Sequence, residues 1–177
     1  MLKYRLRRIL TFAIVIAVFF VLQGSVFNRL ALANIAPNLF IILVSTMGLI
    51  RGSKEGIMVG FFSGLLLDTV TGGWLGFYAL IYLLIGYVNG LFKPMFVEDN
   101  PRLPLILIGS SSFVYGLVIY FFRFVLRGEL HFFHYFNNII VLEMLYTTLV
   151  SLVLYRVLVH INNKLETAEE RGTSHFI

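Results

Sequence analysis

The chain has 177 residues, of which 59% are hydrophobic and only 13% are charged, and its mean hydropathy is +0.89. An ordinary soluble domain carries about a quarter charged residues, so this composition excludes one, and the length leaves no room for a separate catalytic module. The absence of cysteine excludes disulfides and thiolate chemistry, while the net charge of +5 comes from basic residues at segment ends, which argues against nucleic acid as a partner.

Six apolar segments follow one another along the chain, and each has a length near that of a transmembrane helix. The first comes after a basic start, as in a signal peptide, but it is longer than a signal h-region and predicts a retained helix. Pro37 suits the first turn of the second helix. A tight turn at Thr71-Gly72-Gly73 predicts that the third and fourth helices form an antiparallel hairpin. The predicted spans are residues 9–27, 36–50, 56–71, 74–92, 104–126 and 138–160.

The basic residues predict the orientation of these spans. Of the 14 Lys and Arg residues, 11 fall on the side of the N-terminus, and only Arg29, Arg123 and Arg127 fall at the other side. Because cytoplasmic loops carry the excess of basic residues, both ends are expected inside. The sequence therefore predicts an all-α membrane protein, a six-transmembrane-helix bundle over residues 1–163 with a polar cytoplasmic tail at 164–177.

Three charges are predicted to lie at membrane depth, near the outer ends of their helices: Asp68, Arg123 and Glu143. A lone charge in hydrocarbon is costly, so such residues usually face the interior and find partners. We expect Arg123 to pair with Asp68, Glu143 or both. This intramembrane polar cluster is either a bundle-stabilising ion pair or a polar pocket or partner contact that opens to the outside.

Small residues recur at helical spacing in the third and fourth segments, as Gly56, Gly60 and Gly64 and as Gly86 and Gly90. Such stripes let helix backbones approach closely. They serve either packing inside the bundle or a docking face for a partner helix.

Catalysis has no positive signal in the sequence. It contains no nucleotide-binding loop, no Ser/His/Asp set and no HExxH motif. His131 and His134 have the spacing of a metal pair, but no third ligand accompanies them, so an interfacial segment is the expectation. We expect no catalytic residues, no metal and no cofactor.

The stretch from residue 60 to residue 90 contains a predicted glycine-rich helix that ends in Leu-Leu-x-Asp, a glycine turn, Leu-Gly-x-x-Ala-Leu and a spaced Gly-x-x-x-Gly. This pattern resembles the central signature of the rod shape-determining protein MreD family. Pro37 with Asn38, and the basic end at Arg51, also fit. The matching positions are Leu66, Asp68, Gly72, Leu75, Gly76, Ala79, Leu80, Gly86 and Gly90.

The resemblance implies a non-enzymatic scaffold of the cell-elongation complex in the bacterial cytoplasmic (inner) membrane. It would maintain cell shape and support peptidoglycan synthesis by binding the bitopic protein MreC, and through it RodA, its transpeptidase partner and MreB. The candidate helix-packing or partner face is then formed by Gly56, Gly60, Gly64, Gly72, Gly76, Gly86 and Gly90.

The family's bundle is also similar to the substrate-binding S components of energy-coupling factor (ECF) vitamin transporters. That similarity implies the alternative function, a vitamin-binding S component. The pair Ala13 and Ala17 is similar to the motif by which S components dock on their coupling subunit, and an outward pocket near Asp68, Trp74 and Tyr78 would hold the ligand.

Overall fold

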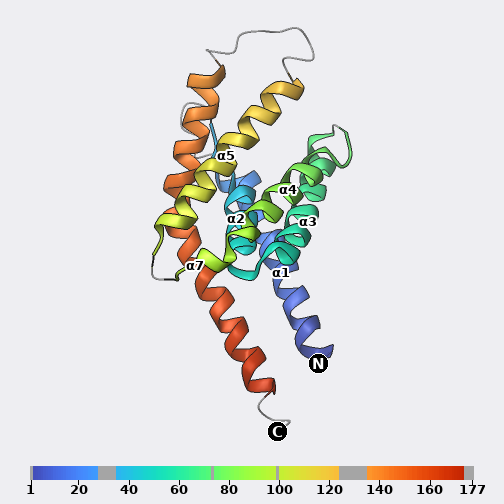
Figure 1. The fold of residues 1–177 in the computed structure, drawn as a ribbon. Coiled ribbons are helices and arrows are strands. Elements are labelled where there is room, and N and C mark those ends of the chain that lie inside the picture. The colour runs from blue at the N-terminus through green and yellow to red at the C-terminus, as the bar shows by residue number, and fades with distance from the viewer. Residues whose placement is uncertain (1, 28–34, 73, 99, 124–134, 174–177) are drawn as a thin grey trace.

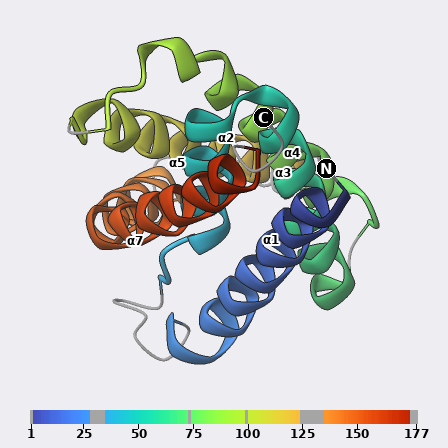
Figure 2. The same ribbon diagram turned by 90° about the horizontal axis from the view of Figure 1, so that it is seen from below.

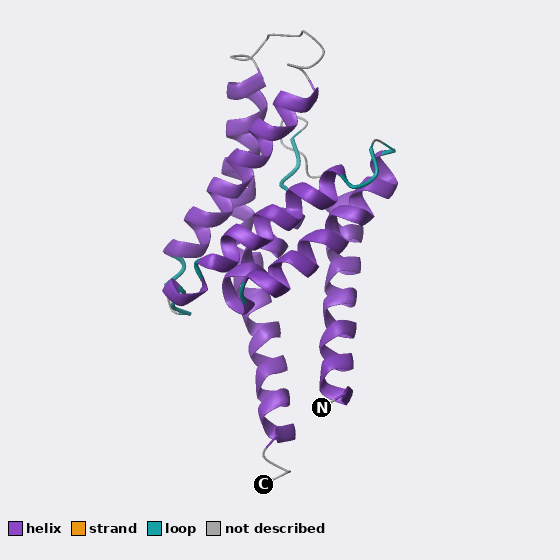
Figure 3. Ribbon diagram, turned by 45° about the vertical axis from the view of Figure 1, so that its right-hand side comes forward, coloured by secondary structure: helices purple, strands orange, loops and turns teal. Residues whose placement is uncertain are grey.

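The structure is a computed structural model that describes residues 2–27, 35–72, 74–98, 100–123 and 135–173. Within these ranges the protein is all-α and has no strand (Figure 3), as predicted. Two short π-helical segments are present: Gln23–Phe27 directly follows the first helix, α1, and Phe136–Ile140 directly precedes the last helix, α7. A 3-10 turn, Lys93–Met95, follows α4. The α-helices are α1 (Leu2–Leu22), α2 (Leu39–Arg51), α3 (Ser53–Thr71), α4 (Phe77–Leu91), α5 (Arg102–Arg123) and α7 (Val141–Thr173).

Helix α2 forms the centre of the bundle, and the other helices surround it (Figures 1 and 2). On one side α5 runs beside α7; on the other, α3 and α4 form the predicted hairpin, against which α1 packs. The start of α1 and the end of α7 reach the same end of the bundle (Figures 1 and 3). We call this end of the bundle the terminal end. We call the opposite end, where α4 and α7 begin, the distal end.

Among the described residues, three helical stretches are long and apolar enough to cross a membrane, namely Arg8–Ser25, Arg102–Phe122 and Val141–Thr167. Large apolar side chains such as Ile14, Ile106 and Val153 are exposed on them, as expected for surfaces that face lipid. Helix α2 differs from them, because residues 39–50 are all buried and its 13 residues extend only about 20 Å. It is a core helix that is shorter than the hydrocarbon layer of about 30 Å.

Helix boundaries differ from the predicted ones where a capping residue decides them. Helix α2 begins at Leu39, not near Pro37, because Asn38 is its N-cap and its side chain accepts a hydrogen bond from the Ile41 N–H at 3.2 Å. Helix α4 begins at Phe77 rather than at residue 74, after Gly76 with φ of 100°. At the C-terminus, α7 continues past residue 160 to Thr173, so most of the predicted tail at 164–177 is helical.

Candidate functional site

Asp68 connects the two helices of the α3–α4 hairpin at the distal end. Its side chain is buried in the last turn of α3, and its carboxylate accepts hydrogen bonds from the backbone N–H groups of Gly76 (2.9 Å), Tyr78 (2.9 Å) and Ala79 (3.2 Å). The first N–H groups of a helix have no partner inside it, and a negative charge there is favourable. Asp68 therefore caps α4 from the neighbouring helix, where Gly76 has no side chain to do so.

The predicted partner of Asp68 was Arg123, whose backbone ends α5. The side chain of Arg123 lies outside the part of the chain that the structure describes, as do His131 and His134, so their predicted contacts stay predictions. The hydrogen bonds found for Asp68 all come from neutral backbone groups.

The predicted glycine stripes face each other inside the hairpin. A Cβ added at Gly60 would overlap the backbone of Tyr82, and one at Gly64 would overlap that of Ala79. Gly56 and Gly86 pack backbone to backbone, and Gly90 lies against Ser53. These five glycines are therefore used within the chain rather than exposed as a face for a partner.

Gly72 and Gly76 have a different place, in the turn between α3 and α4. Both have positive φ, 63° and 100°, which L side chains rarely adopt, and no atom lies within 4 Å of a Cβ built on either. Their role is to shape the turn that presents the N–H groups of α4 to Asp68.

Glu143 lies at the distal end, in the first turn of α7. It lines a partly open cavity of about 390 Å³ that also touches the end of α1 and helices α2 to α5. Tyr78 connects this cavity to Asp68, since its backbone N–H donates to that carboxylate. The two predicted carboxylates thus lie around one site but are held by different groups. The other lining residues are Gln23, Ile35, Ala36, Asn38, Phe40, Leu67, Thr71, Tyr82, Tyr115 and Ile139.

Asn38 is the centre of the polar contacts in this cavity. Its side-chain oxygen accepts from the Tyr82 hydroxyl at 3.0 Å, and its side chain hydrogen-bonds Glu143. Its backbone N–H donates to Thr147 Oγ1 of α7 at 3.0 Å. Nearby, Gln23 accepts from the Leu39 N–H at 2.7 Å and donates to the Pro37 carbonyl at 3.0 Å. The start of the buried helix α2 is thus fixed by side chains from the π-helical segment after α1, from α4 and from α7.

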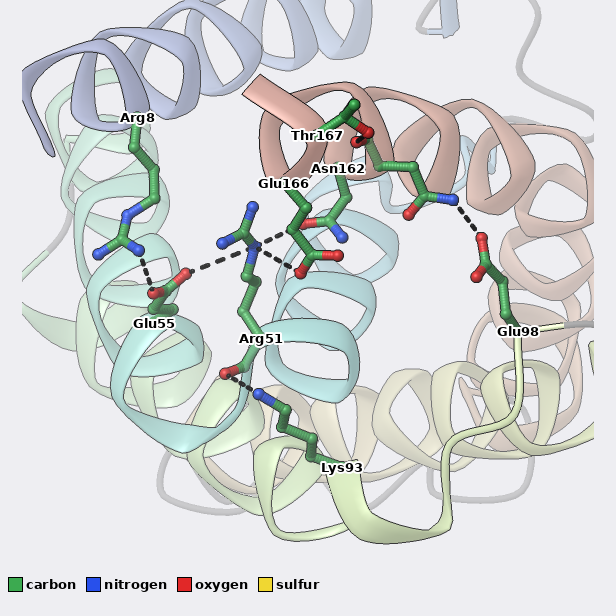
Figure 4. A network of polar contacts seen from close by, with 9 residues as sticks. Arg8, Arg51, Glu55, Lys93, Glu98, Asn162, Glu166 and Thr167 are labelled. Atoms are coloured by element: carbon green, nitrogen blue, oxygen red, sulfur yellow. Dashed lines mark hydrogen bonds and ion pairs between the residues drawn. The ribbon is translucent and has the colours of Figure 1, made fainter. Parts of the chain in front are cut away.

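A second polar cluster lies at the terminal end and centres on Arg51, whose side chain is only 8% exposed (Figure 4). Its guanidinium lies 4.0 Å from Glu55 and 3.9 Å from Glu166, and it donates to Asn162. Arg8 of α1 pairs with Glu55 at 3.3 Å. These contacts tie α1, α2, α3 and α7 together at one end of the bundle.

The loop after α4 joins the same cluster, which we call the Arg51 cluster (Figure 4). Lys93 donates to the backbone carbonyl of Arg51 at 3.0 Å, so a cation lies at the C-terminal end of α2, where the helix dipole favours it. Asn163 of α7 donates to the Glu98 side chain, which holds the other end of this loop against α7.

An apolar groove of about 480 Å³ runs between α1 and α3, outside both polar sites. Ala13, of the predicted alanine pair, lines it together with Phe12, Ile16, Met58 and Phe62. In the part of the chain that the structure describes, no group of three or more His, Cys, Asp or Glu side chains could hold a metal ion.

Sequence reasoning missed the contributions of Asn38, Tyr82, Tyr115 and Arg51 to these sites. Asn38 had a usable signal, since an Asn before an apolar helical run is a strong N-cap candidate. The tyrosines had none, because aromatic residues are frequent in apolar helices of every kind. Arg51 was assigned to topology and to the family signature, not to a cluster inside the bundle, and its partner Glu166 is 115 positions further along the chain.

The described helices, three of them apolar and of membrane-spanning length, together with the carboxylate of Asp68 buried within the bundle, define a helical membrane protein. A family model described as rod shape-determining protein MreD matches residues 5–165, and the chain belongs to this family. The predicted family is therefore confirmed over nearly the whole chain. No curated protein and no solved structure matches it, so the similarity to S components stays a prediction.

Proposed function

We propose that this protein is a non-enzymatic scaffold of the bacterial rod complex, spanning the cytoplasmic membrane six times with both ends inside. The observation that carries the proposal is the MreD family match over residues 5–165, since that family is one of rod shape-determining components. Its partner would be an MreC-like bitopic protein. Through that protein it would act on RodA, its transpeptidase partner and MreB in cell elongation and peptidoglycan synthesis.

The distribution of polar groups supports a protein that acts through its helix faces. Two charged side chains within the bundle, Asp68 and Arg51, are engaged in holding helices together. The outer surfaces of α1, α4, α5 and α7 carry large exposed apolar side chains. A partner that is itself a membrane helix can bind such surfaces without any catalytic group.

Co-purification tests the scaffold proposal. The full chain is co-expressed with the bitopic MreC-like protein of the same genome, solubilised, and captured through a tag on either protein. A stable complex is expected, and photo-crosslinkers placed at the exposed residues Met58 of α3, Leu84 of α4 and Val153 of α7 should react with the partner from some of these helices and not from others. A chain that stays alone under all conditions would contradict the proposal.

The orientation is tested separately, and the absence of native cysteine makes the test clean. Lys54→Cys lies at the terminal end, in the first turn of α3, and Trp74→Cys lies in the distal turn, where Trp74 is exposed. In spheroplasts, a membrane-impermeant maleimide should label the Cys at position 74, and the Cys at position 54 only after lysis. The reverse pattern would place both termini outside.

The cavity of about 390 Å³ is the one observation that favours the alternative function, a vitamin-binding S component. Its volume lies within the range of roughly 300–1,000 Å³ that is usual for small-ligand sites. Native mass spectrometry of the freshly purified protein decides this alternative. A bound vitamin would support it, and thermal shifts that stay silent across a vitamin panel would contradict it.

A further inference from the structure

The distal cavity contains a carboxylate that the scaffold function does not use. Glu143 faces it and is largely removed from water, with the Asn38 amide as its hydrogen-bond partner. An amide donates a hydrogen bond but does not neutralise the charge. Among the lining residues that the structure describes there is no lysine and no arginine. A carboxylate in such a place is costly unless a cation comes to it.

The rest of the lining has the composition that recognises an organic cation. Tyr82 and Tyr115 stack with their ring centroids 5.6 Å apart, and Phe40 and Tyr78 lie against this pair at 6.1 Å and 6.5 Å. Aromatic faces attract ammonium groups, and cages of such rings are a common way to bind them. The negative carboxylate adds a direct charge interaction in a partly buried site.

The positions of these groups are fixed before any ligand arrives. The Tyr82 hydroxyl donates to Asn38, and the same Asn38 is tied to Thr147 and to the first turn of α2. Asp68 holds the backbone of Tyr78 from the other side of the hairpin. Binding would therefore require little reorganisation of the cavity, which favours affinity.

We propose that this cavity binds an ammonium group, with the cation against Glu143 and in contact with the tyrosine rings. The group belongs either to a small free amine or to the headgroup of an aminophospholipid, which share this chemistry. The inference is independent of the scaffold function, because it concerns a cavity inside the bundle rather than a partner surface.

The test compares a cation with a neutral molecule of the same shape. Choline and its uncharged isostere 3,3-dimethylbutan-1-ol are titrated by calorimetry into the full-length protein in detergent. Choline is expected to bind at least about tenfold more tightly. Glu143→Gln should remove that preference, whereas Glu166→Gln, the same change at the terminal end of the same helix, should keep it. Tyr115→Leu should weaken the binding of choline more than it weakens the binding of the isostere.

One further measurement, made on the wild-type protein and on Glu143→Gln, identifies the source of the ammonium group. Native mass spectrometry after reconstitution in equal phosphatidylethanolamine and phosphatidylglycerol shows whether the aminolipid is retained and whether Glu143→Gln loses it. Retention that depends on Glu143 assigns the site to a lipid headgroup. Choline binding that depends on Glu143, without such retention, assigns it to a free amine.

Three results would overturn the proposal. The first is equal binding, or no binding, of choline and its isostere by the wild-type protein. The second is an unchanged choline affinity in Glu143→Gln, provided that this variant melts as a folded protein. The third is an internal ion pair: if Arg123→Gln and Glu143→Gln lower the melting temperature equally and the double variant lowers it no further, Arg123 of the same chain is the cation.

Discussion

The two ends of the bundle hold their charges in opposite ways. At the terminal end, Arg51 lies between Glu55 and Glu166, and Arg8 adds a second cation, so charges of both signs compensate one another. At the distal end, the carboxylate of Asp68 is held by three backbone N–H groups and that of Glu143 by an amide. In the part of the chain that the structure describes, the terminal end is a network of charge pairs, whereas the carboxylates of the distal end are held by neutral donors.

This difference has a functional consequence. A carboxylate that accepts three N–H groups at a helix start, as Asp68 does, is satisfied and structural. Glu143 lies beside a partly open cavity, and one amide is its partner among the residues that the structure describes, so it keeps acceptor capacity for a further group. The terminal end is thus built to fix helices, and the distal end combines a fixed cap with an adaptable site.

The largest effect is expected from breaking the hairpin that both ends share. Gly86→Ala would place a Cβ on the backbone of Gly56, where only a shift of α3 against α4 can make room. We expect a loss of about 4 kcal/mol or more, or no folded protein, measured by SDS unfolding in mixed micelles. Gly24→Ala is the control, because nothing lies within 4 Å of its Cβ. Equal stability of the two variants would show that the close approach is dispensable.

The next effect tests the distal cap. Asp68→Ala leaves the N–H groups of Gly76, Tyr78 and Ala79 without their acceptor, so we expect a loss of about 3 kcal/mol. Asp68→Asn should lose less, because an amide oxygen still accepts. The exposed neighbour Thr69→Ala is the control in the same thermal melts. An Asp68→Ala protein that melts like wild type would mean that the turn holds α4 by itself.

A smaller effect is expected at the terminal end. Arg51→Gln removes the cation between Glu55 and Glu166 in a nearly buried position, and we expect a loss of about 2 kcal/mol. Because the remaining carboxylates repel each other, Glu166→Gln should restore part of the stability in the double variant. A double variant no more stable than Arg51→Gln would argue that packing of the side chain matters more than its charge.

The smallest effect is expected for Arg8→Gln. The Arg8 side chain is 33% exposed, so its pair with Glu55 should contribute less than about 1 kcal/mol. Its contribution should also fade when the salt concentration rises, since screening acts on exposed pairs. Melting curves of both arginine variants at low and high salt measure this. If salt changes the stability lost in Arg51→Gln as much as it changes the stability lost in Arg8→Gln, the difference in burial between the two side chains does not matter.

The prediction from sequence was most accurate where a local pattern dictates structure. The all-α class and the order of the helices follow from runs of apolar residues separated by polar or glycine turns. The hairpin at residues 53–91 follows from its short turn, and its glycines lie where close helix packing requires them. Helix ends were less accurate, because a cap such as Asn38, or a glycine such as Gly76, shifts a boundary by two or three residues.

Composition and pattern by themselves determined the class, the family signature and the presence of Asp68 and Glu143 inside the bundle. Only the tertiary structure decided what those carboxylates contact. A buried charge takes whichever donor the folded chain brings within reach, and for Asp68 these are N–H groups that are free only because α4 begins there. The same holds for the Arg51 cluster and for the tyrosines around Glu143, because contacts between residues far apart in the chain exist only after the helices have packed.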